Sequence, residues 1–580
     1  MRNLFSRTLE LLRPFRRSYT RFLAGTVARQ ALVVGGGYSL VWALHRSLGK
    51  PSIPLWVFIT GFLIYDFALL ELDLGLSQFF VSRVSFPMFA FLRTKALKKI
   101  FEMPQSWHHR QQSGALTGKI NDGVGRVVQT AEGFGRELCP AVIQTFLTLI
   151  PLLYFSPWTG VFVFFTAVIF VFIALAESRE RQPFRKARHD NYAEDFGMFS
   201  ECIEYVQPVE HFGQTERILG GYGQLQERIA TQGIQEIRIG CRYSRKRTLL
   251  FAAAKRACQA FWIVQFRDGA LDAAMVMYLN MLIEDLFHSF AGYAGLIERL
   301  YDGIEPTRTL VGLLEEQPAM SEASGHAVEV PDRIGIEIEN VQFSYDSGPP
   351  VLQNFSMTVE PGAVVGIVGR SGIGKTTIQQ LLSRVYDVQH GSIRIAGKDV
   401  REWPLNQLRS LFSSVTQNGG VFFTGASILD TIRFAKPDAD LEQVVEAAKC
   451  ACIHDEILLM PDGYKTPVGP RGVTMSKGQQ QRIALAQAVL ALHDNRKVLI
   501  LDEFTSALDS KTEQQVLLNL LPRLKNKTVI VVAHRLATLR KVADRIIVID
   551  ENGIAEAGSH AELIQMGGSY SEMAELQTSA

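Results

Sequence analysis

Six long apolar stretches dominate the first half of the chain, and polar or basic stretches separate them. Each is close to the roughly 20 residues that a helix needs to cross a bilayer. The pattern predicts an α-helical polytopic membrane domain with six transmembrane helices, preceded by an amphipathic helix at 1–21. The predicted spans are 22–44, 55–80, 138–156, 158–177, 247–266 and 271–295.

The basic residues give the predicted orientation. The stretches after the second and fourth spans are long and rich in arginine and lysine, and so is the N-terminus. By the positive-inside rule, these parts and everything after the sixth span are cytoplasmic. The Arg-rich start also has the composition of a transit peptide, but the apolar span begins at once and no small-residue cleavage site precedes it. A helix on the inner membrane surface is therefore favoured.

The pattern changes after residue 305, where the predicted membrane domain (22–305, with two long cytoplasmic loops) ends. Residues 306–333 are polar and carry three prolines, which indicates a helix end followed by a linker. From 334 to 580, short apolar runs such as Val364–Val368 alternate with helical stretches. This second half is predicted to be an α/β P-loop ATPase domain.

Composition excludes two other classes of protein. A chain of 580 residues is too long for one soluble core, and a net charge of +2 gives no reason to expect nucleic acid as a partner. The six cysteines are scattered, which argues against a disulfide-stapled fold. Cys450, Cys452 and His454 lie close in sequence, but no fourth metal ligand is near, so buried helix thiols are favoured.

The strongest chemical signal is the pattern G-x-x-x-x-G-K-T between an apolar strand and a helical stretch. Backbone N–H groups of such a loop hold phosphates. Lys375 would reach the β- and γ-phosphates, and Thr376 would offer its hydroxyl to Mg²⁺. The candidate nucleotide ligands are Gly369, Arg370, Ser371, Gly372, Ile373, Gly374, Lys375, Thr376 and Thr377.

Other candidate residues follow apolar strands. Asp502 and Glu503 come directly after Val498–Leu501, where Asp502 would position Mg²⁺ and Glu503 would polarise the attacking water. His534 ends another apolar strand, as a sensor of the γ-phosphate would. Gln417 ends a short strand and is a candidate contact for Mg²⁺ or water. Tyr345 offers an aromatic surface for adenine.

The order of these motifs, with "MSKGQ" before the strand that carries the two acids, resembles the nucleotide-binding domain of ABC transporters. The six spans resemble the membrane half of ABC exporters, so the chain is identified as an exporter-type half-transporter. The resemblance implies ATP and Mg²⁺ as cofactors and a head-to-tail homodimer. In that dimer ATP lies between the P-loop of one chain and Ser476, Lys477, Gly478 and Gln479 of the other. A heterodimer with another half-transporter is the alternative.

Two positions depart from the family pattern. The signature is usually Leu-Ser-Gly-Gly-Gln, and Lys477 replaces its first glycine. That change costs about 1 kcal/mol if the glycine needs a positive φ, so we expect a working but slower site. Pro470 stands where many exporters carry a glutamate that contacts the membrane loops of the partner, so coupling is expected to differ in detail.

Charges inside the predicted spans suggest the kind of cargo. Asp66, Glu284 and Asp285 lie near mid-span, where an ionised group normally faces water or a partner. They predict a polar cavity for a hydrophilic or cationic cargo, such as a peptide, a metabolite or a lipid-linked compound. Lys255 and Arg256 also fit side chains that reach back to the inner membrane surface.

Together these features predict an ATP hydrolase that drives export across a bacterial inner membrane. An ATP-gated channel or a regulator is the second hypothesis, but the retained Glu503 argues for turnover. Import on the same frame, for example of a siderophore-like cargo, stays open. A soluble ATPase of DNA repair has no use for six spans.

Overall fold

The computed structural model divides the chain into two compact units, which we describe separately. One comprises residues 1–103 and 107–318, and the other comprises 104–106 and 319–580. The structure describes residues 7, 10–11, 13–49, 55–104, 107–108, 110–111, 113–317, 328–345, 348–370, 372–416, 420–423, 425–469, 473–494, 496–533, 535–551 and 553–578.

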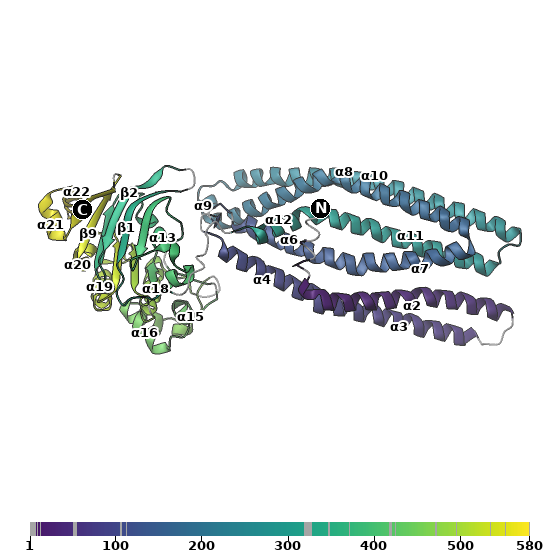
Figure 1. The fold of residues 1–580 in the computed structure, drawn as a ribbon, viewed down its shortest axis with the longest axis horizontal. Coiled ribbons are helices and arrows are strands. Elements are labelled where there is room, and N and C mark those ends of the chain that lie inside the picture. Colours follow the sequence, from purple (N-terminus) through teal and green to yellow (C-terminus); the bar gives the residue numbers. More distant parts are fainter. Residues whose placement is uncertain are drawn as a thin grey trace. The chain divides into compact units, whose positions relative to one another are not determined.

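The first unit is built from long helices, drawn from purple to teal in Figure 1. Each of the six predicted spans falls on one of them. The long helices are α2 (Arg16–Gly49), α3 (Leu55–Phe80), α7 (Cys139–Phe155), α8 (Pro157–Glu204), α10 (Thr215–Arg267) and α11 (Ala273–Asp302). The shorter helices are η1 (Arg13–Phe15), η2 (Val81–Ser85), α4 (Phe86–Glu102), α6 (Ser113–Gly133), η3 (Phe134–Leu138), α9 (Val206–His211) and α12 (Ile304–Glu315).

The basic stretches predicted as cytoplasmic loops are helical. The second span continues through η2 into α4, and α8 runs 27 residues past the predicted end of the fourth span at 177. At the N-terminus, α2 begins at Arg16, inside the range predicted for a separate helix. Two of the described helical segments, Gly114–Phe155 and Pro157–Glu204, are long and apolar enough to cross a membrane by length and composition.

Charged residues hold α8 against α10 and α11, and α8 and α10 run side by side along most of their length (Figure 1). Arg181 donates to Glu236 over 3.0 Å and to Glu298 over 2.6 Å, and Arg185 lies 2.5 Å from Asp302. Glu236 is 1% exposed and Arg185 is 4% exposed, so these groups neutralise one another within the protein. Part of the positive charge counted as cytoplasmic is therefore internal and compensated.

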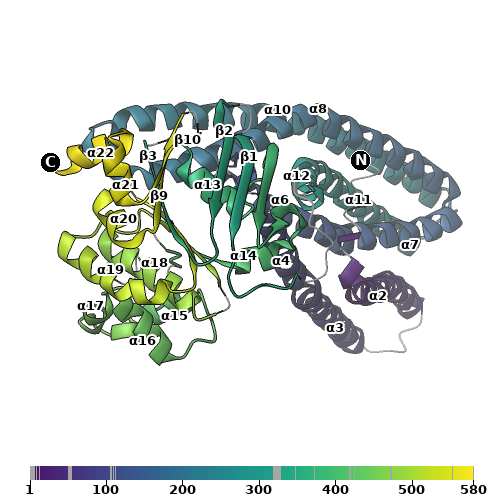
Figure 2. The ribbon, with the colours of Figure 1, turned by 60° about the vertical axis from the view of Figure 1, so that its left-hand side comes forward.

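The second unit contains two sheets, which Figure 2 shows from a turned viewpoint. A four-stranded antiparallel sheet has the order β2-β1-β4-β5, and a six-stranded sheet has the order β10-β9-β3-β8-β7-β6. In the larger sheet β6, β7, β8, β3 and β9 are parallel and β10 is antiparallel. The strands are β1 (Ile336–Ser344), β2 (Pro350–Val359), β3 (Val364–Gly369), β4 (His390–Ile395), β5 (Lys398–Asp399), β6 (Phe412–Val415), β7 (Val498–Asp502), β8 (Thr528–Val532), β9 (Arg545–Asp550) and β10 (Gly553–Gly558).

Helices surround these sheets, and α15, α16 and α18 pack together (Figure 2). They are α13 (Lys375–Leu382), η4 (Val400–Glu402), α14 (Leu405–Ser410), α15 (Ile428–Arg433), α16 (Leu441–Cys450), α17 (His454–Leu458), η5 (Gly463–Lys465), α18 (Lys477–Ala491), α19 (Ser510–Leu524), α20 (Leu536–Val542), α21 (His560–Met566) and α22 (Ser569–Thr578).

The parallel strands are buried on both faces, which explains why they appear in the sequence as continuous apolar runs. Side chains alternate along β7: Leu499 and Leu501 pack into the core that α18 and α19 share, whereas Val498 and Ile500 pack toward the antiparallel sheet. This double burial fixes the height of each strand end. The polar residues that follow β3 and β7 are therefore brought to one edge of the sheet.

Candidate nucleotide-binding site

The P-loop connects β3 to α13 in the predicted strand, loop and helix context. Gly374 precedes the helix with a φ of 102°, a conformation that a residue with a Cβ atom adopts only with strain. Lys375 is buried, and its Nζ donates to the carbonyls of Gly369 at 2.7 Å and Arg370 at 2.9 Å. The lysine side chain thus lies across the loop and bonds to two of its carbonyls.

Asp502 and Glu503 lie beside this loop, at the end of β7. Thr376 Oγ1 donates to Asp502 Oδ2 over 3.3 Å, and Asp502 is 2% exposed. Burial lowers the pKa of Lys375, while the carboxylates of Glu503 and Asp502 act in the opposite direction. The structure thus brings together the lysine, the hydroxyl and both acids that the sequence singled out.

Glu503 has an unusual backbone. Its φ is 49°, in the left-handed region that residues other than glycine rarely occupy, and its N–H donates to the carbonyl of Val532 at the end of β8 over 2.9 Å. This bond pins the turn after β7 to the neighbouring strand. Strained backbone of this kind is common where a side chain must be aimed at a reaction.

Tyr345 lies against the P-loop helix. Its hydroxyl is 2.8 Å from Thr377 Oγ1 and donates to Gln380 Oε1 over 2.7 Å. The edges of its ring meet Phe343 and Tyr386. The aromatic surface predicted for adenine is therefore held at the same helix that begins with the phosphate loop.

The signature residues form the start of α18 as a capping box. Ser476 Oγ accepts from the N–H of Gln479 at 3.2 Å, and Gln479 Oε1 accepts from the N–H of Ser476 at 3.0 Å. Lys477 is the first helical residue and does not have a positive φ, so the predicted cost of about 1 kcal/mol does not arise.

Position 478 requires a glycine because the backbone of Ala507 lies close to it. A Cβ added there would lie 3.0 Å from the carbonyl oxygen of Ala507, in the segment that follows Glu503. The second signature glycine is therefore needed for packing against that segment, and the first is not needed for backbone conformation.

Family models match both halves of the chain. A model described as ABC transporter transmembrane region matches residues 52–240, and one described as ABC transporter matches 352–506. A mitochondrial iron-sulfur clusters transporter of Yarrowia lipolytica is 30% identical over 497 residues, covering 83% of this chain and 68% of the relative. The chain belongs to the ABC transporter family. The predicted family and fold class are therefore confirmed.

Other similarities cover the whole length. An ATP-dependent lipid A-core flippase of Legionella pneumophila is 28% identical and covers 99% of this chain and 97% of the relative. A structure titled as a bacterial Atm1-family ABC exporter with ATP bound has a TM-score of 0.89 at 24% identity, covering 97% of this chain and 99% of the other, which shows the fold. The chain spans only 56 to 64% of several longer relatives, among them a heavy metal tolerance protein of Schizosaccharomyces pombe.

Several residues that shape this ABC transporter site carry no motif signal. Gln481, on the signature helix, is buried and bonds to Glu503 and to Ser506 and Ala507 after it. Glu456 accepts from Gln479 Nε2 at 3.0 Å and from Arg482 at 2.6 Å, which fixes the signature side chain. The sequence signal for Gln481 is weak, because it consists of one glutamine on an otherwise apolar helix face.

Four candidate residues, Ser371, Gln417, Pro470 and His534, lie outside the described residues. In the cysteine-rich segment, His454 Nδ1 is 2.9 Å from the hydroxyl of Tyr464, and Cys450 contacts the carbonyl of Asn519. Among the described residues, no group of three or more histidine, cysteine, aspartate or glutamate side chains is arranged to hold a metal ion.

The three candidate cargo residues do not form one cluster within the chain. Asp66 is exposed on α3, which packs mainly on α2, whereas Glu284 and Asp285 lie on α11, which packs on α7 and α8. Glu284 is paired with Lys255 of α10. The negative charge predicted for a cavity lining is therefore partly compensated.

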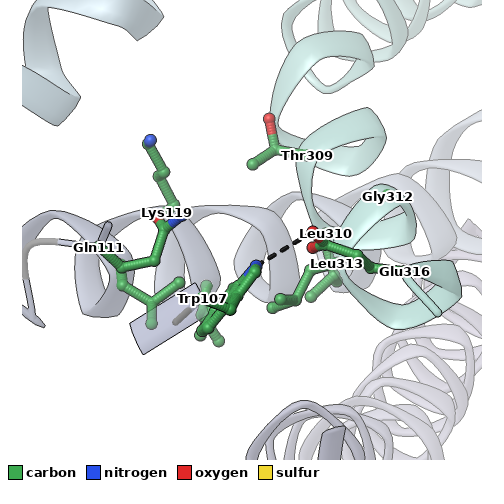
Figure 3. A pocket seen from close by; sticks show the side chains of 10 residues that line it. Trp107, Gln111, Lys119, Thr309, Leu310, Gly312, Leu313 and Glu316 are labelled. Carbon is green, nitrogen blue, oxygen red and sulfur yellow. Dashed lines mark hydrogen bonds between the residues drawn. The ribbon is translucent and has the colours of Figure 1, made fainter. Parts of the chain in front are cut away.

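A separate cavity lies in the helical unit, between residues 107–120 and α12 (Figure 3). Its volume is about 210 Å³, below the roughly 300 Å³ at which ligand pockets begin. Trp107 Nε1 donates to Glu316 Oε1 over 3.0 Å, while Lys119 extends away from that pair (Figure 3). The bond connects the end of α12 to the segment before α6. We therefore interpret this cavity as a gap in the packing between these two segments and not as a ligand site.

Proposed function

We propose that the chain is an ATP-driven exporter that works as a homodimer by alternating access. Its predicted location is a bacterial inner membrane, with the N-terminal helix (1–21) and the ATPase domain (334–580) in the cytoplasm and the membrane domain (22–305) joined to it through 306–333. The observation that carries the proposal is the contact of Thr376 with Asp502 beside Glu503, next to the buried Lys375. Such an arrangement serves phosphoryl transfer to water.

The P-loop would bind the phosphates in a simple exchange. Lys375 gives up the carbonyls of Gly369 and Arg370 and turns to the β- and γ-phosphates, which are better acceptors for an ammonium. Residues 369–377 supply backbone N–H groups, and Tyr345 supplies the surface for adenine. Thr376 and Asp502 present the hydroxyl and carboxylate oxygens that Mg²⁺ prefers, and bound Mg²⁺ would neutralise phosphate charge.

Hydrolysis would then depend on Glu503 as the group that orients and deprotonates the attacking water. Gln417 and His534 are proposed to contact Mg²⁺ or water and the γ-phosphate, in line with their positions after strands. The signature residues Ser476 to Gln479 of one chain would close over ATP held by the P-loop of the other. The signature residues bond to one another and to Glu456, so the N-terminal end of α18 already has a fixed shape for this role.

We propose a polar or amphipathic cargo that carries both charge signs. Across α10 and α11, Lys255 pairs with Glu284, and one turn further Gln259 donates to Asn280 over 2.6 Å. Lys255 lies 12 residues before the end of α10 and Glu284 lies 11 residues after the start of α11, about 17 Å along either axis. That is close to the middle of a hydrocarbon core of about 30 Å, where polar side chains face water, a partner or a substrate.

The proposal is tested by ATP hydrolysis of the purified chain in lipid, beside Glu503→Gln. We expect the wild type to turn over and the variant to bind ATP with a rate at least about 10²-fold lower. The matched control is Glu572→Gln, an exposed glutamate on α22, which should hydrolyse at the wild-type rate. A wild type that binds ATP without turnover would contradict the homodimeric motor.

A further inference from the structure

Glu513 on α19 connects two segments that follow neighbouring strands of the six-stranded sheet. Its Oε1 accepts a hydrogen bond from Thr505 Oγ1 over 2.9 Å and another from Thr538 Oγ1. Its Oε2 accepts from Arg535 Nη1 over 2.7 Å. Thr505 lies two residues after Glu503 at the end of β7, whereas Arg535 and Thr538 lie at the start of α20, after β8. One carboxylate therefore binds both segments.

These contacts are largely shielded from water. The Glu513 side chain is 13% exposed, and Thr505 and Thr538 are 4% and 1% exposed. A carboxylate in such a place is stable only where it is hydrogen-bonded and paired with a cation, which Arg535 supplies. Hydrogen bonds to an ionised acceptor are shorter and stronger than those between neutral groups. The two segments are therefore fixed to each other through α19 as well as through the sheet.

The backbone of Glu503 lies between two points of attachment. Its own N–H donates to the carbonyl of Val532 over 2.9 Å, and two residues later Thr505 donates to Glu513. The φ of Glu503 is 49°, and backbone in this region persists only where the surrounding structure over-determines it. The bond of Thr505 to Glu513 is one of the contacts that hold this turn in place.

We propose that Glu513 is a positioning residue for ATP hydrolysis, which holds the turn of the proposed catalytic Glu503 in a fixed relation to the start of α20. This inference rests on the proposed function, because Glu513 acts through Glu503. The alternative is that Glu513 only stabilises α19, since an acid in the first turn of a helix interacts favourably with the helix N-terminus.

The two roles predict different kinetics. A residue that acts through Glu503 changes kcat and leaves the KM for ATP unchanged, because the contacts of the P-loop are not altered. Its effect also disappears once Glu503 is replaced, since no carboxylate is then left to position. A residue that only stabilises α19 lowers the amount of folded protein, and this effect is the same factor with or without Glu503.

The experiment measures ATP hydrolysis by the full chain in lipid nanodiscs, normalised to the amount of protein that binds ATP. Glu513→Gln removes the negative charge that faces Arg535, and we expect kcat to fall about tenfold with KM within about twofold. In the Glu503→Gln background the same substitution should change the residual rate by less than about twofold. The matched control is Glu442→Gln, an exposed glutamate in the first turn of α16, which should retain the wild-type kcat.

A second pair of variants tests the hydrogen bond without removing the charge. Thr505→Val keeps the shape of the side chain but removes the hydroxyl that donates to Glu513, whereas Thr505→Ser keeps the hydroxyl. We expect kcat to fall about fivefold in the valine variant and to stay near the wild-type value in the serine variant. Equal losses in both variants would overturn the proposal.

The outcomes separate this inference from the proposed function. If the wild type hydrolyses ATP and Glu513→Gln lowers the rate by the same factor with and without Glu503, the role of Glu513 is wrong while the motor stands. A higher KM with an unchanged kcat would also overturn the role of Glu513. If the wild type binds ATP but shows no turnover above that of Glu503→Gln, both proposals fail.

Discussion

Gln481 donates a hydrogen bond from its side-chain amide to the backbone carbonyl of Glu503 over 2.8 Å. The same Nε2 donates to Ser506 Oγ at 3.0 Å, and Oε1 accepts from the N–H of Ala507 at 3.0 Å. One buried side chain thus connects the signature helix to the turn that carries the proposed catalytic carboxylate. In the proposed homodimer, a movement of the signature helix would reach that turn through this side chain.

Gln481→Glu tests this connection. The carboxylate can still accept from Ala507 but no longer donates to Glu503, and two oxygens then face each other in a buried place. Leaving a buried carbonyl without its donor costs about 1–3 kcal/mol. We expect ATP hydrolysis to fall about tenfold or more and the thermal midpoint to drop. Gln515→Glu, on the exposed face of α19, is the control and should change neither. If Gln481→Glu hydrolysed ATP at the wild-type rate, the connection between Gln481 and Glu503 would have no role in hydrolysis.

Gly478→Ala tests the close contact with Ala507. The added Cβ would lie 3.0 Å from a backbone oxygen, so the signature helix must shift away from the segment after Glu503 by a few tenths of an ångström. Since both elements form the proposed ATP sandwich, we expect a several-fold lower rate of hydrolysis. Gly233→Ala, on α10 with open space around it, should be silent. Equal rates for both variants would contradict the packing explanation.

The sequence predicted the elements of the ATPase unit well, for a physical reason. Strands such as Val498–Leu501 are buried on both faces and therefore appear as uninterrupted apolar runs, and the acids that follow them mark the edge of the sheet. The P-loop is equally visible because a left-handed glycine and a lysine must stand at fixed spacing. The family resemblance then supplied the roles.

What the sequence did not predict depends on contacts between distant segments. Gln481 and Glu456 belong to no motif, and their partners lie 22 to 26 residues away. The effect of Lys477 on the backbone could not be decided without knowing that position 477 is already helical. In the helical unit, the sequence did not predict that Arg181 and Arg185 of α8 pair with Glu236 and Asp302 on other helices.

The hydrogen bonds of Glu456 predict that its contribution to the stability of the folded chain depends on pH, which Glu456→Gln tests. Burial raises the pKa of Glu456, but hydrogen bonds from Arg482 and Gln479 lower it by more, so its pKa in the folded chain is below the ordinary value. The ionised Glu456 carboxylate therefore contributes its full share to the free energy of unfolding above about pH 4.3. That contribution is lost as the pH falls through the pKa that Glu456 has in the folded chain. Since the carboxylate is 40% exposed, we expect no more than about 1 kcal/mol at pH 7.

The measurement is the difference in thermal midpoint between wild type and Glu456→Gln. It should be constant from pH 7 to about pH 5 and should shrink below about pH 4.3. The exposed Glu442→Gln on α16 serves as the control for general effects of acid. If the difference in thermal midpoint grew on acidification, the pKa of Glu456 would be raised in the folded chain, which contradicts the assigned hydrogen bonds.

The polar contact between α10 and α11 predicts that Lys255 and Glu284 act as a unit. Removing either partner leaves a charge near the middle of the predicted span without its counter-charge, whereas removing both does not. We expect Lys255→Gln and Glu284→Gln each to lower the thermal midpoint in nanodiscs, with the double variant nearer the wild type and a coupling of about 0.5–3 kcal/mol. The control pair, Arg242 and Glu180, is exposed, and the same substitutions should couple by less than about 1 kcal/mol there. Additive effects at Lys255 and Glu284 would mean that water or cargo, and not the pair itself, satisfies each charge.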